Sequence, residues 1–273
     1  MRDLHWLDAV GLLRRERRPG VLVTLAGVRG HAPRDAGAKM VVAAQESWGS
    51  VGGGNLEETA VTRARRMLDD GDREPETLLL RLSDKVATEH GRQCCGGEVT
   101  VLLEPLAVVP AVAVFGLGHV GIELARILCR HDLELHLADS RESYVDARAM
   151  AVLDGPATVH AHHAPLPEVV LGQVPQGSHV VVMTHDHAED FALCDAALRC
   201  GHLASIGLIG SAAKWRRFEA ALAVEGHAPE AVDRIRCPIG DGPPGKEPAT
   251  IAVGVAAQLL GLARSAADVP RIR

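Results

Sequence analysis

The stretch AVAVFGLGHVGIELARIL, residues 111–128, decides the fold of the second half of this chain. Its first five residues predict a buried strand, and Gly116, Gly118 and Gly121 form the pattern GxGxxG between that strand and a helix. The first glycine permits a tight turn, the second lets backbone approach a phosphate, and the third lets the helix pack on the strand. This context favours a dinucleotide-type turn, although glycines kept only for packing are an open alternative.

Strands and helices continue to alternate after this turn. Further strands are predicted in LELHLADS, ATVHAHH, HVVVMTHDH and ASIGLIGSAAKW. Such alternation implies right-handed crossovers, so residues 108–273 predict an α/β, Rossmann-like, doubly wound parallel sheet. Residues 1–107 predict a smaller mixed α/β domain, with an amphipathic N-terminal helix and a small mixed sheet. Its strands are expected in VLVTLAG, AKMVVA, TLLLRL and EVTVLLEPL, with a helix after the turn GSVGGGNLEE.

Composition narrows the class of protein. A net charge of -6 argues against non-specific nucleic-acid binding. No apolar stretch approaches the roughly 18 residues that cross a bilayer, and the N-terminus lacks a basic start followed by an apolar run. We therefore expect a cytoplasmic protein with no nucleic-acid or membrane partner. Its six cysteines are expected to be reduced.

Polar residues follow several strands of the predicted parallel sheet, at the edge where such folds bind ligands. Asp139 lies about twenty residues after the glycine turn, where an acid meets a ribose hydroxyl or another polar group. Arg141 could instead favour a phosphate. Helix starts near Ser211 and Pro248 suit an anionic ligand, because their backbone amides are unpaired.

The segment THDH supplies His185 and His187 at the end of an apolar strand. In an extended segment the two side chains point in opposite directions, which weakens a two-histidine metal site. His185 is expected to hydrogen-bond a ligand or a neighbouring loop, and a purely structural role is an alternative.

Cys94 and Cys95 stand side by side before two glycines. Adjacent cysteines rarely pair with each other, and a structural zinc site usually needs a C-x2-4-C spacing. Thiolates favour soft metals, so one of these thiols is predicted to contact a cofactor, with a structural role as the alternative. The other four cysteines are expected to pack in the core.

Seven segments together carry a resemblance: GHAPRDAGAKM, GSVGGGNLEE, QCCGGEVTVLLEP, FGLGHVG, THDH, IGLIGSAAKW, and PIG followed by GKEPATIAV. In order and spacing they resemble the XdhC/CoxI family, accessory proteins of xanthine dehydrogenase and related molybdenum hydroxylases. The resemblance implies a non-enzymatic chaperone that binds molybdenum cofactor (molybdopterin), protects it during sulfuration and delivers it to the apo-enzyme. Implied partners are the dehydrogenase's cofactor-binding subunit, a cysteine desulfurase and a second copy of the chain, as a homodimer.

The resemblance also suggests how the cofactor would be held. Either adjacent thiol would contact molybdenum, and the phosphate would meet backbone amides of the triple-glycine turn or of the Rossmann turn. Arg34 and Lys39 could add charge-assisted hydrogen bonds, and the Rossmann turn could instead take a nucleotide. The predicted cofactor-binding residues are Cys94, Cys95, Gly52, Gly53, Gly54, Arg34, Gly116, Gly118, Gly121, Asp139, His185 and Ser211.

Two positions weaken the match. His31 stands where many members of the family have a small hydroxylated residue, and Asp241 would repel a phosphate placed in its loop. Two other functions stay open. An NAD(P)-dependent oxidoreductase would need His119 or His185 as its proton donor, and a metal-dependent hydrolase would need a third ligand beside the THDH histidines.

Overall fold

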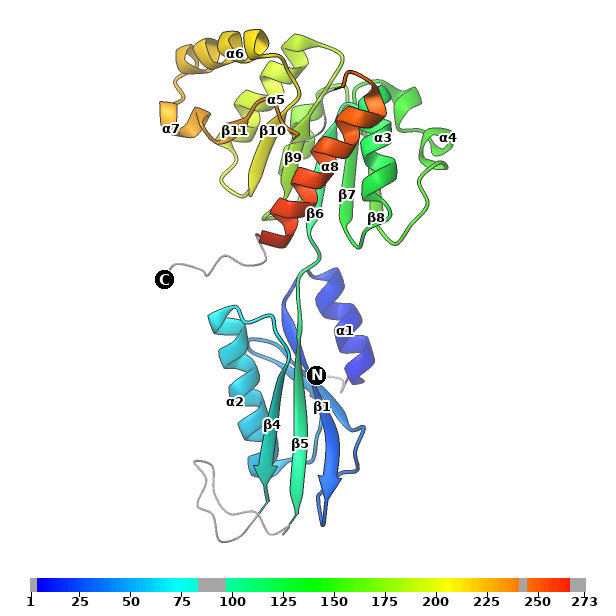
Figure 1. Ribbon diagram of the computed structural model, residues 1–273, viewed down its shortest axis with the longest axis vertical. Coiled ribbons are helices and arrows are strands. Elements are labelled where there is room, and N and C mark those ends of the chain that lie inside the picture. The colour runs from blue at the N-terminus through cyan, green and yellow to red at the C-terminus, as the bar shows by residue number, and fades with distance from the viewer. Residues whose placement is uncertain (1–3, 83–96, 241–244, 266–273) are drawn as a thin grey trace. The chain divides into compact units, whose positions relative to one another are not determined.

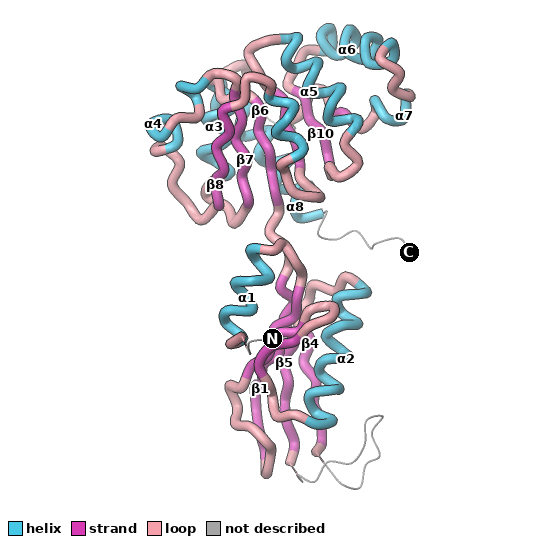
Figure 2. The backbone as a smooth tube through the Cα atoms, turned by 180° about the vertical axis from the view of Figure 1, so that it is seen from behind, coloured by secondary structure: helices cyan, strands magenta, loops and turns pink. Residues whose placement is uncertain are grey.

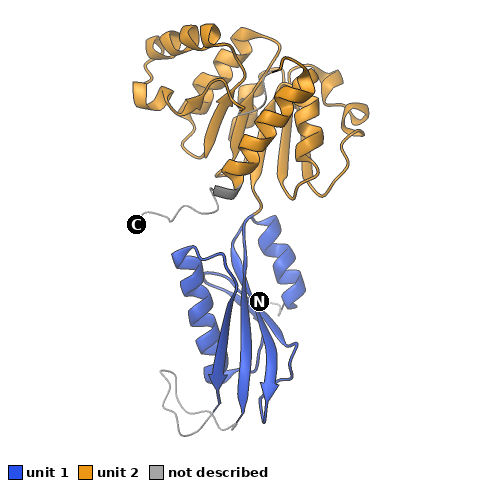
Figure 3. Cartoon of the chain, viewed as in Figure 1, with its two compact units in different colours: residues 1–108, 268–273 blue, residues 109–267 orange. Residues whose placement is uncertain are grey.

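The computed structural model describes residues 4–82, 97–240 and 245–265 of the 273-residue chain. The chain divides into two compact units, one formed by residues 1–108 and 268–273 and the other by residues 109–267 (Figure 3). Each unit has its own sheet and its own hydrophobic core.

The first unit is built on a five-stranded sheet with the order β3-β2-β1-β5-β4. Its elements are α1 (Trp6–Arg15), β1 (Gly20–Arg29), β2 (Lys39–Val42), β3 (Ser47–Gly49), α2 (Gly54–Asp70), β4 (Glu76–Arg81) and β5 (Glu98–Leu106). All of its strand pairs are antiparallel, so the expected mixed sheet is wrong. A nine-residue loop joins β1 to β2 and a four-residue turn joins β2 to β3, and such direct connections produce antiparallel neighbours.

The two helices of the first unit cover opposite faces of this sheet (Figures 1 and 2). Leu56, Ala60, Ala64 and Met67 of α2 are buried against one face, as their helical spacing predicts. Leu13 of α1 packs on the other face with Val41. Because side chains alternate along a strand, Met40 and Val42 contribute to the core beneath α2.

The second unit is a parallel sheet with the order β11-β10-β9-β6-β7-β8, which confirms the Rossmann-like prediction. Its strands are β6 (Ala111–Phe115), β7 (Glu134–Asp139), β8 (Thr158–His163), β9 (His179–Val182), β10 (Ser205–Leu208) and β11 (Ile235–Arg236). Its helices are α3 (His119–Leu128), η1 (Glu142–Tyr144), α4 (Ala147–Met150), η2 (Pro167–Gly172), α5 (His187–Arg199), α6 (Ala212–Val224), α7 (Pro229–Val232) and α8 (Pro248–Ser265).

Helices cover both faces of the parallel sheet. On one face α3 and α8 pack side by side over Val112, Val114 and Leu135 (Figure 1). On the other face η2, α5 and α6 pack over Ala113 and Phe115. Strand order reverses beside β6, which has β7 on one side and β9 on the other. Ligands of such sheets bind at this reversal, beyond the carboxyl ends of the strands.

Of the helices in the described ranges, none combines the length and the apolar character needed to cross a membrane.

Candidate functional site

The glycine turn after β6 contains two glycines that packing requires and one that it does not. Gly116 has φ +99°, and a Cβ there would lie 2.4 Å from the Met183 carbonyl oxygen. A Cβ on Gly121 would lie 2.1 Å from the Gly116 carbonyl oxygen. A Cβ on Gly118 would have nothing within 4 Å, and φ there is -64°. Neither space nor conformation demands glycine at 118, so this position would allow the close approach of a ligand.

The helix that follows this turn begins without a side-chain cap. Gly118 is the N-cap of α3 and makes no side-chain hydrogen bond to it. By contrast, the Asp186 carboxylate caps α5 and the Ser211 hydroxyl accepts from the Lys214 amide at the start of α6. Ser211, predicted to bind cofactor, thus caps its own helix. Of these three helices, α3 offers uncapped amides and a positive dipole end to an anion.

Asp139, at the end of β7, is already surrounded by donors. Its Oδ2 accepts from the Leu117 amide at 2.7 Å and from Arg141 Nη2 at 2.9 Å. Its Oδ1 accepts from the Arg141 amide at 3.0 Å and from Arg141 Nε at 2.9 Å. A carboxylate has about four acceptor positions, so this arrangement leaves none for a ribose hydroxyl.

The charge state of this pair follows from its surroundings. Burial by itself would raise the pKa of Asp139, which is 2% exposed, but the bonds from Arg141 and Leu117 outweigh burial and lower the pKa. Arg141 in turn stacks on Tyr144, with 3.6 Å between the guanidinium carbon and the ring centroid. The pair is therefore ionised at neutral pH and nearly neutral in sum.

A hydrogen bond crosses the carboxyl end of β6. The Ser140 hydroxyl, which follows β7, donates to Glu189 Oε2 at 2.9 Å, and Glu189 belongs to the helix that follows β9. Burial is the main reason that the pKa of Glu189 is raised. Because β6 lies between β7 and β9, this bond joins the two sides of the crevice near the glycine turn.

A buried ion pair holds the loops after β9 and β10. The Lys214 ammonium contacts the Asp190 carboxylate and also donates to the Ile209 carbonyl at 3.2 Å. Asp190 Oδ1 accepts from both the amide and the hydroxyl of Thr184 at 2.8 Å. This network fixes the backbone of the THDH segment at Thr184. His185 and His187 of that segment are exposed, and His187 is the first residue of α5.

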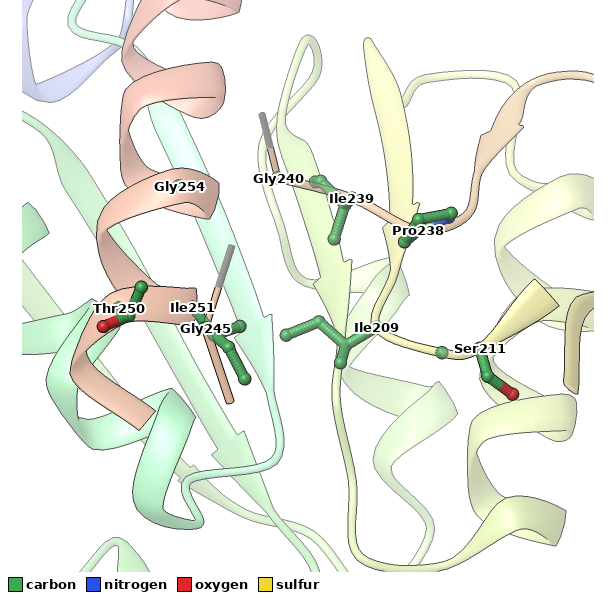
Figure 4. Close-up of a pocket in the computed structure, with 10 residues that line it drawn as sticks. Ile209, Ser211, Pro238, Ile239, Gly240, Gly245, Thr250, Ile251 and Gly254 are labelled. Atoms are coloured by element: carbon green, nitrogen blue, oxygen red, sulfur yellow. The ribbon is translucent and has the colours of Figure 1, made fainter. Parts of the chain in front are cut away.

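A cavity of about 340 Å³ lies between the loops after β10 and β11 and the first turns of α8 (Figure 4). No charged side chain is among the described residues that line it, so it suits an uncharged part of a ligand. Those residues are Ile209, Gly210, Ser211, Pro238, Ile239, Gly240, Gly245, Thr250, Ile251 and Gly254.

In the first unit, an acidic side chain occupies the triple-glycine turn. Gly52, Gly53 and Gly54 all have positive φ, and α2 begins directly after Gly53. The Glu57 carboxylate accepts from the Gly53 amide at 3.1 Å and from the Ser50 hydroxyl at 2.6 Å. A phosphate could reach the Gly53 amide only by displacing Glu57.

The remaining predicted residues of the first unit fall in two places. Arg34 is exposed in the loop between β1 and β2, whose Pro33 packs against Gly52. Gly97 lies beside the His31 carbonyl of the same loop, since a Cβ on it would be 2.2 Å from that oxygen. Lys39 donates to Thr24 at 2.8 Å and belongs to the α1 side of the sheet, away from α2. Cys94, Cys95 and Asp241 lie outside the described residues.

Sequence reasoning overlooked two of the residues that organise this edge, Glu189 and Asp190, and it did not predict the pairing of Lys214 with Asp190. A charged residue on a helical face that is otherwise apolar was the available signal for Asp190. It shares the buried face of α5 with the core residues Leu193 and Ala197, but its partner Lys214 is 24 residues away.

The parallel sheet, the glycine turn and the uncapped α3 define a Rossmann-domain protein, and the carboxyl edge of its sheet is the candidate ligand site. Residues 112–259 match the XdhC Rossmann domain, and residues 13–82 match the XdhC and CoxI family. The chain therefore belongs to the XdhC/CoxI family, as the seven segments predicted.

Two individual proteins are similar to this chain. The uncharacterized protein YqeB of Escherichia coli (strain K12) is 24% identical over 255 residues, which are 93% of this chain and 45% of YqeB. The chain thus spans less than half the length of that relative. A solved structure described as a xanthine dehydrogenase from Bacillus halodurans has 18% identity and a TM-score of 0.48, with 96% of both chains covered.

Proposed function

We propose that this protein binds molybdenum cofactor as cargo and takes part in the maturation of a xanthine dehydrogenase or related molybdenum hydroxylase. The observation that carries the proposal is that family matches fall in both compact units, over residues 13–82 and 112–259. A Rossmann domain alone would support many ligands, so the proposal depends on the match of both domains to one family.

The chemistry of the second unit suits the pterin end of such a cargo. Its phosphate would lie at the uncapped amides of α3, where Gly118 leaves room for close approach. A pterin ring carries N–H donors, and the Glu189 carboxylate beside the same turn could accept from them. Cys94 and Cys95, which lie outside the described residues, stay the predicted contact for molybdenum, because thiolates prefer soft metals.

In this proposal the chain binds the molybdenum cofactor and delivers it to the apo-enzyme. It makes and breaks no covalent bonds. An NAD(P)-dependent oxidoreductase is less well supported, because the acceptor positions of Asp139 are already filled by Leu117 and Arg141. Partners follow from the same proposal: the dehydrogenase's cofactor-binding subunit, a cysteine desulfurase and a second copy of this chain.

The test is direct binding. Purified protein is mixed anaerobically with molybdenum cofactor released from a molybdenum enzyme, and the protein fraction is assayed for molybdenum and for oxidised pterin fluorescence. We expect close to one molybdenum and one pterin per chain, and no turnover of NADH or NADPH. Absence of both from the protein fraction, or robust hydride transfer, would overturn the proposal.

The thiol contact needs its own variants. Changing Cys94 and Cys95 together to alanine should weaken cargo binding while thermal unfolding stays nearly unchanged. Cys200→Ala, at a partly buried cysteine of the second unit, is the matched control and should bind normally. If the double variant binds with wild-type affinity, the thiol contact is wrong while cargo binding itself still stands.

A further inference from the structure

Three potential metal ligands lie together on strands β7 and β8, in the second unit. Glu134 and His136 are two residues apart on β7 and therefore share a face of the sheet. His160 of β8 lies directly opposite His136 in the parallel register. Within the part of the chain that the structure describes, this is the one group of three such residues whose ligand atoms all lie within 4.8 Å of one another.

The spacing of these atoms fits a tetrahedral ion. Glu134 Oε1 lies 3.3 Å from His136 Nε2 and 3.4 Å from His160 Nε2. A tetrahedral zinc with bonds of about 2.0–2.1 Å separates neighbouring ligand atoms by about 3.3 Å. The rings of His136 and His160 are stacked, with centroids 4.6 Å apart and planes 20° apart, so one ring must turn for both nitrogens to point at one ion.

A further histidine supports the central ligand. His162 Nε2 lies 3.1 Å from His136 Nδ1, so the two rings share a hydrogen bond through the nitrogen that faces away from Glu134. If His136 Nε2 binds an ion, its proton is on Nδ1 and donates to His162. Metal-binding histidines usually have such an outer partner, which orients the ring.

One of the three side chains is buried, and another is exposed to solvent, from which an ion could enter. His136 is 5% exposed and lies on the sheet face that η2 and α5 cover, whereas the His160 side chain is 41% exposed.

We propose that Glu134, His136 and His160 bind one zinc-class divalent ion, with water at the fourth position, and that the ion fastens edge strand β8 to β7. Two imidazoles and one carboxylate form a donor set that zinc accepts. The site begins at the amino end of β7, so it is separate from the ligand edge, and its ion is not the molybdenum of the cargo.

The test uses the full chain without a histidine tag, freed of metal by a chelator. Zinc binding is measured by titration calorimetry, and cobalt is added as a spectroscopic probe because tetrahedral cobalt absorbs visible light strongly. We expect one ion per chain and a rise in the unfolding temperature on adding zinc. A chain that binds no zinc, or shows no tetrahedral cobalt spectrum, would overturn the proposal.

Variants separate this site from other zinc ligands. His160→Gln and Glu134→Gln should each abolish one-to-one binding and the thermal shift, while His162→Gln should weaken binding roughly 10–100-fold. His163→Gln is the matched control, because His163 is exposed on the opposite face of β8. Normal binding by His160→Gln and Glu134→Gln would refute the site. So would loss of zinc only when Cys94 and Cys95 are replaced, since the ion would then be held by thiolates.

Discussion

The amide of Leu117 donates to the buried carboxylate of Asp139 at 2.7 Å and thereby joins the ends of β6 and β7. Leu117 lies inside the glycine turn, so Asp139 positions that turn from within the protein. In many dinucleotide-binding sheets an acid at this place is available to a ribose hydroxyl. In this protein the Asp139 carboxylate holds the glycine turn in place. A ligand of the turn would therefore be bound by backbone amides.

Removing this charge should cost stability. Asp139→Asn keeps one acceptor oxygen for Leu117 but loses the ion pair with Arg141, so we expect the free energy of unfolding to fall by about 2 kcal/mol. Urea denaturation measures it. A loss below about 0.5 kcal/mol would mean that Asp139 does not hold the turn.

The same contribution should depend on pH. Although burial opposes it, hydrogen bonding holds the pKa of Asp139 below its ordinary value of about 3.9. Its stabilisation is therefore complete above that ordinary value and is lost as pH falls through the lower, folded pKa. The difference in unfolding free energy between wild type and Asp139→Asn should be constant from neutral pH to about pH 5, then shrink below about pH 4. An unchanged difference in strong acid would contradict this assignment.

The Lys214–Asp190 pair should behave as a coupled unit. Lys214→Met leaves a buried carboxylate uncompensated and should cost about 3–5 kcal/mol. Adding Asp190→Asn removes that charge, so the double variant should be less destabilised than the sum of the two single variants. Arg216→Met, at an exposed position of the same helix, is the control and should change stability by less than about 0.5 kcal/mol. Additive losses would show that the two groups act independently.

The glycines of the turn should separate folding from binding. Gly121→Ala forces a Cβ against the Gly116 carbonyl and should cost about 3 kcal/mol or more. Gly118→Ala should change stability by no more than about 1 kcal/mol, because the added methyl meets nothing. If the cargo phosphate lies there, Gly118→Ala should still weaken binding at least tenfold in the molybdenum assay. If this variant binds cargo with wild-type affinity, the phosphate does not lie at Gly118.

Thiol reactivity should report on the adjacent cysteines. Burial raises the pKa of Cys194 to about 12 and also raises the pKa values of Cys200 and Cys237, so these thiols should alkylate slowly at pH 8. Iodoacetamide followed by mass spectrometry should therefore label Cys94 or Cys95 first. Bound cargo should slow that labelling, and equal labelling with and without cargo would contradict a thiol contact.

Local patterns were enough to predict much of the architecture. The turn GSVGGGNLEE predicted α2, whose apolar positions Leu56, Ala60, Ala64 and Met67 are buried, and the glycine turn at 116–121 predicted β6, α3 and their close packing. These features depend on residues that are near one another in the chain, where the helical and strand repeats act. The antiparallel order of the first sheet could not be predicted in this way, because it depends on which strands pair, and β1 pairs with β5, which is distant in the sequence.

The sequence alone predicted the two-domain α/β plan, the parallel second sheet and the family to which the chain belongs. The tertiary structure alone decided what each polar group binds: Asp139 pairs with Arg141, Glu57 accepts from the Gly53 amide, and His136 lies opposite His160 on the neighbouring strand. Periodicity is a local property of the chain. Hydrogen-bond partners are chosen by competition among all groups that the fold brings within about 3 Å, and most of those are distant in sequence.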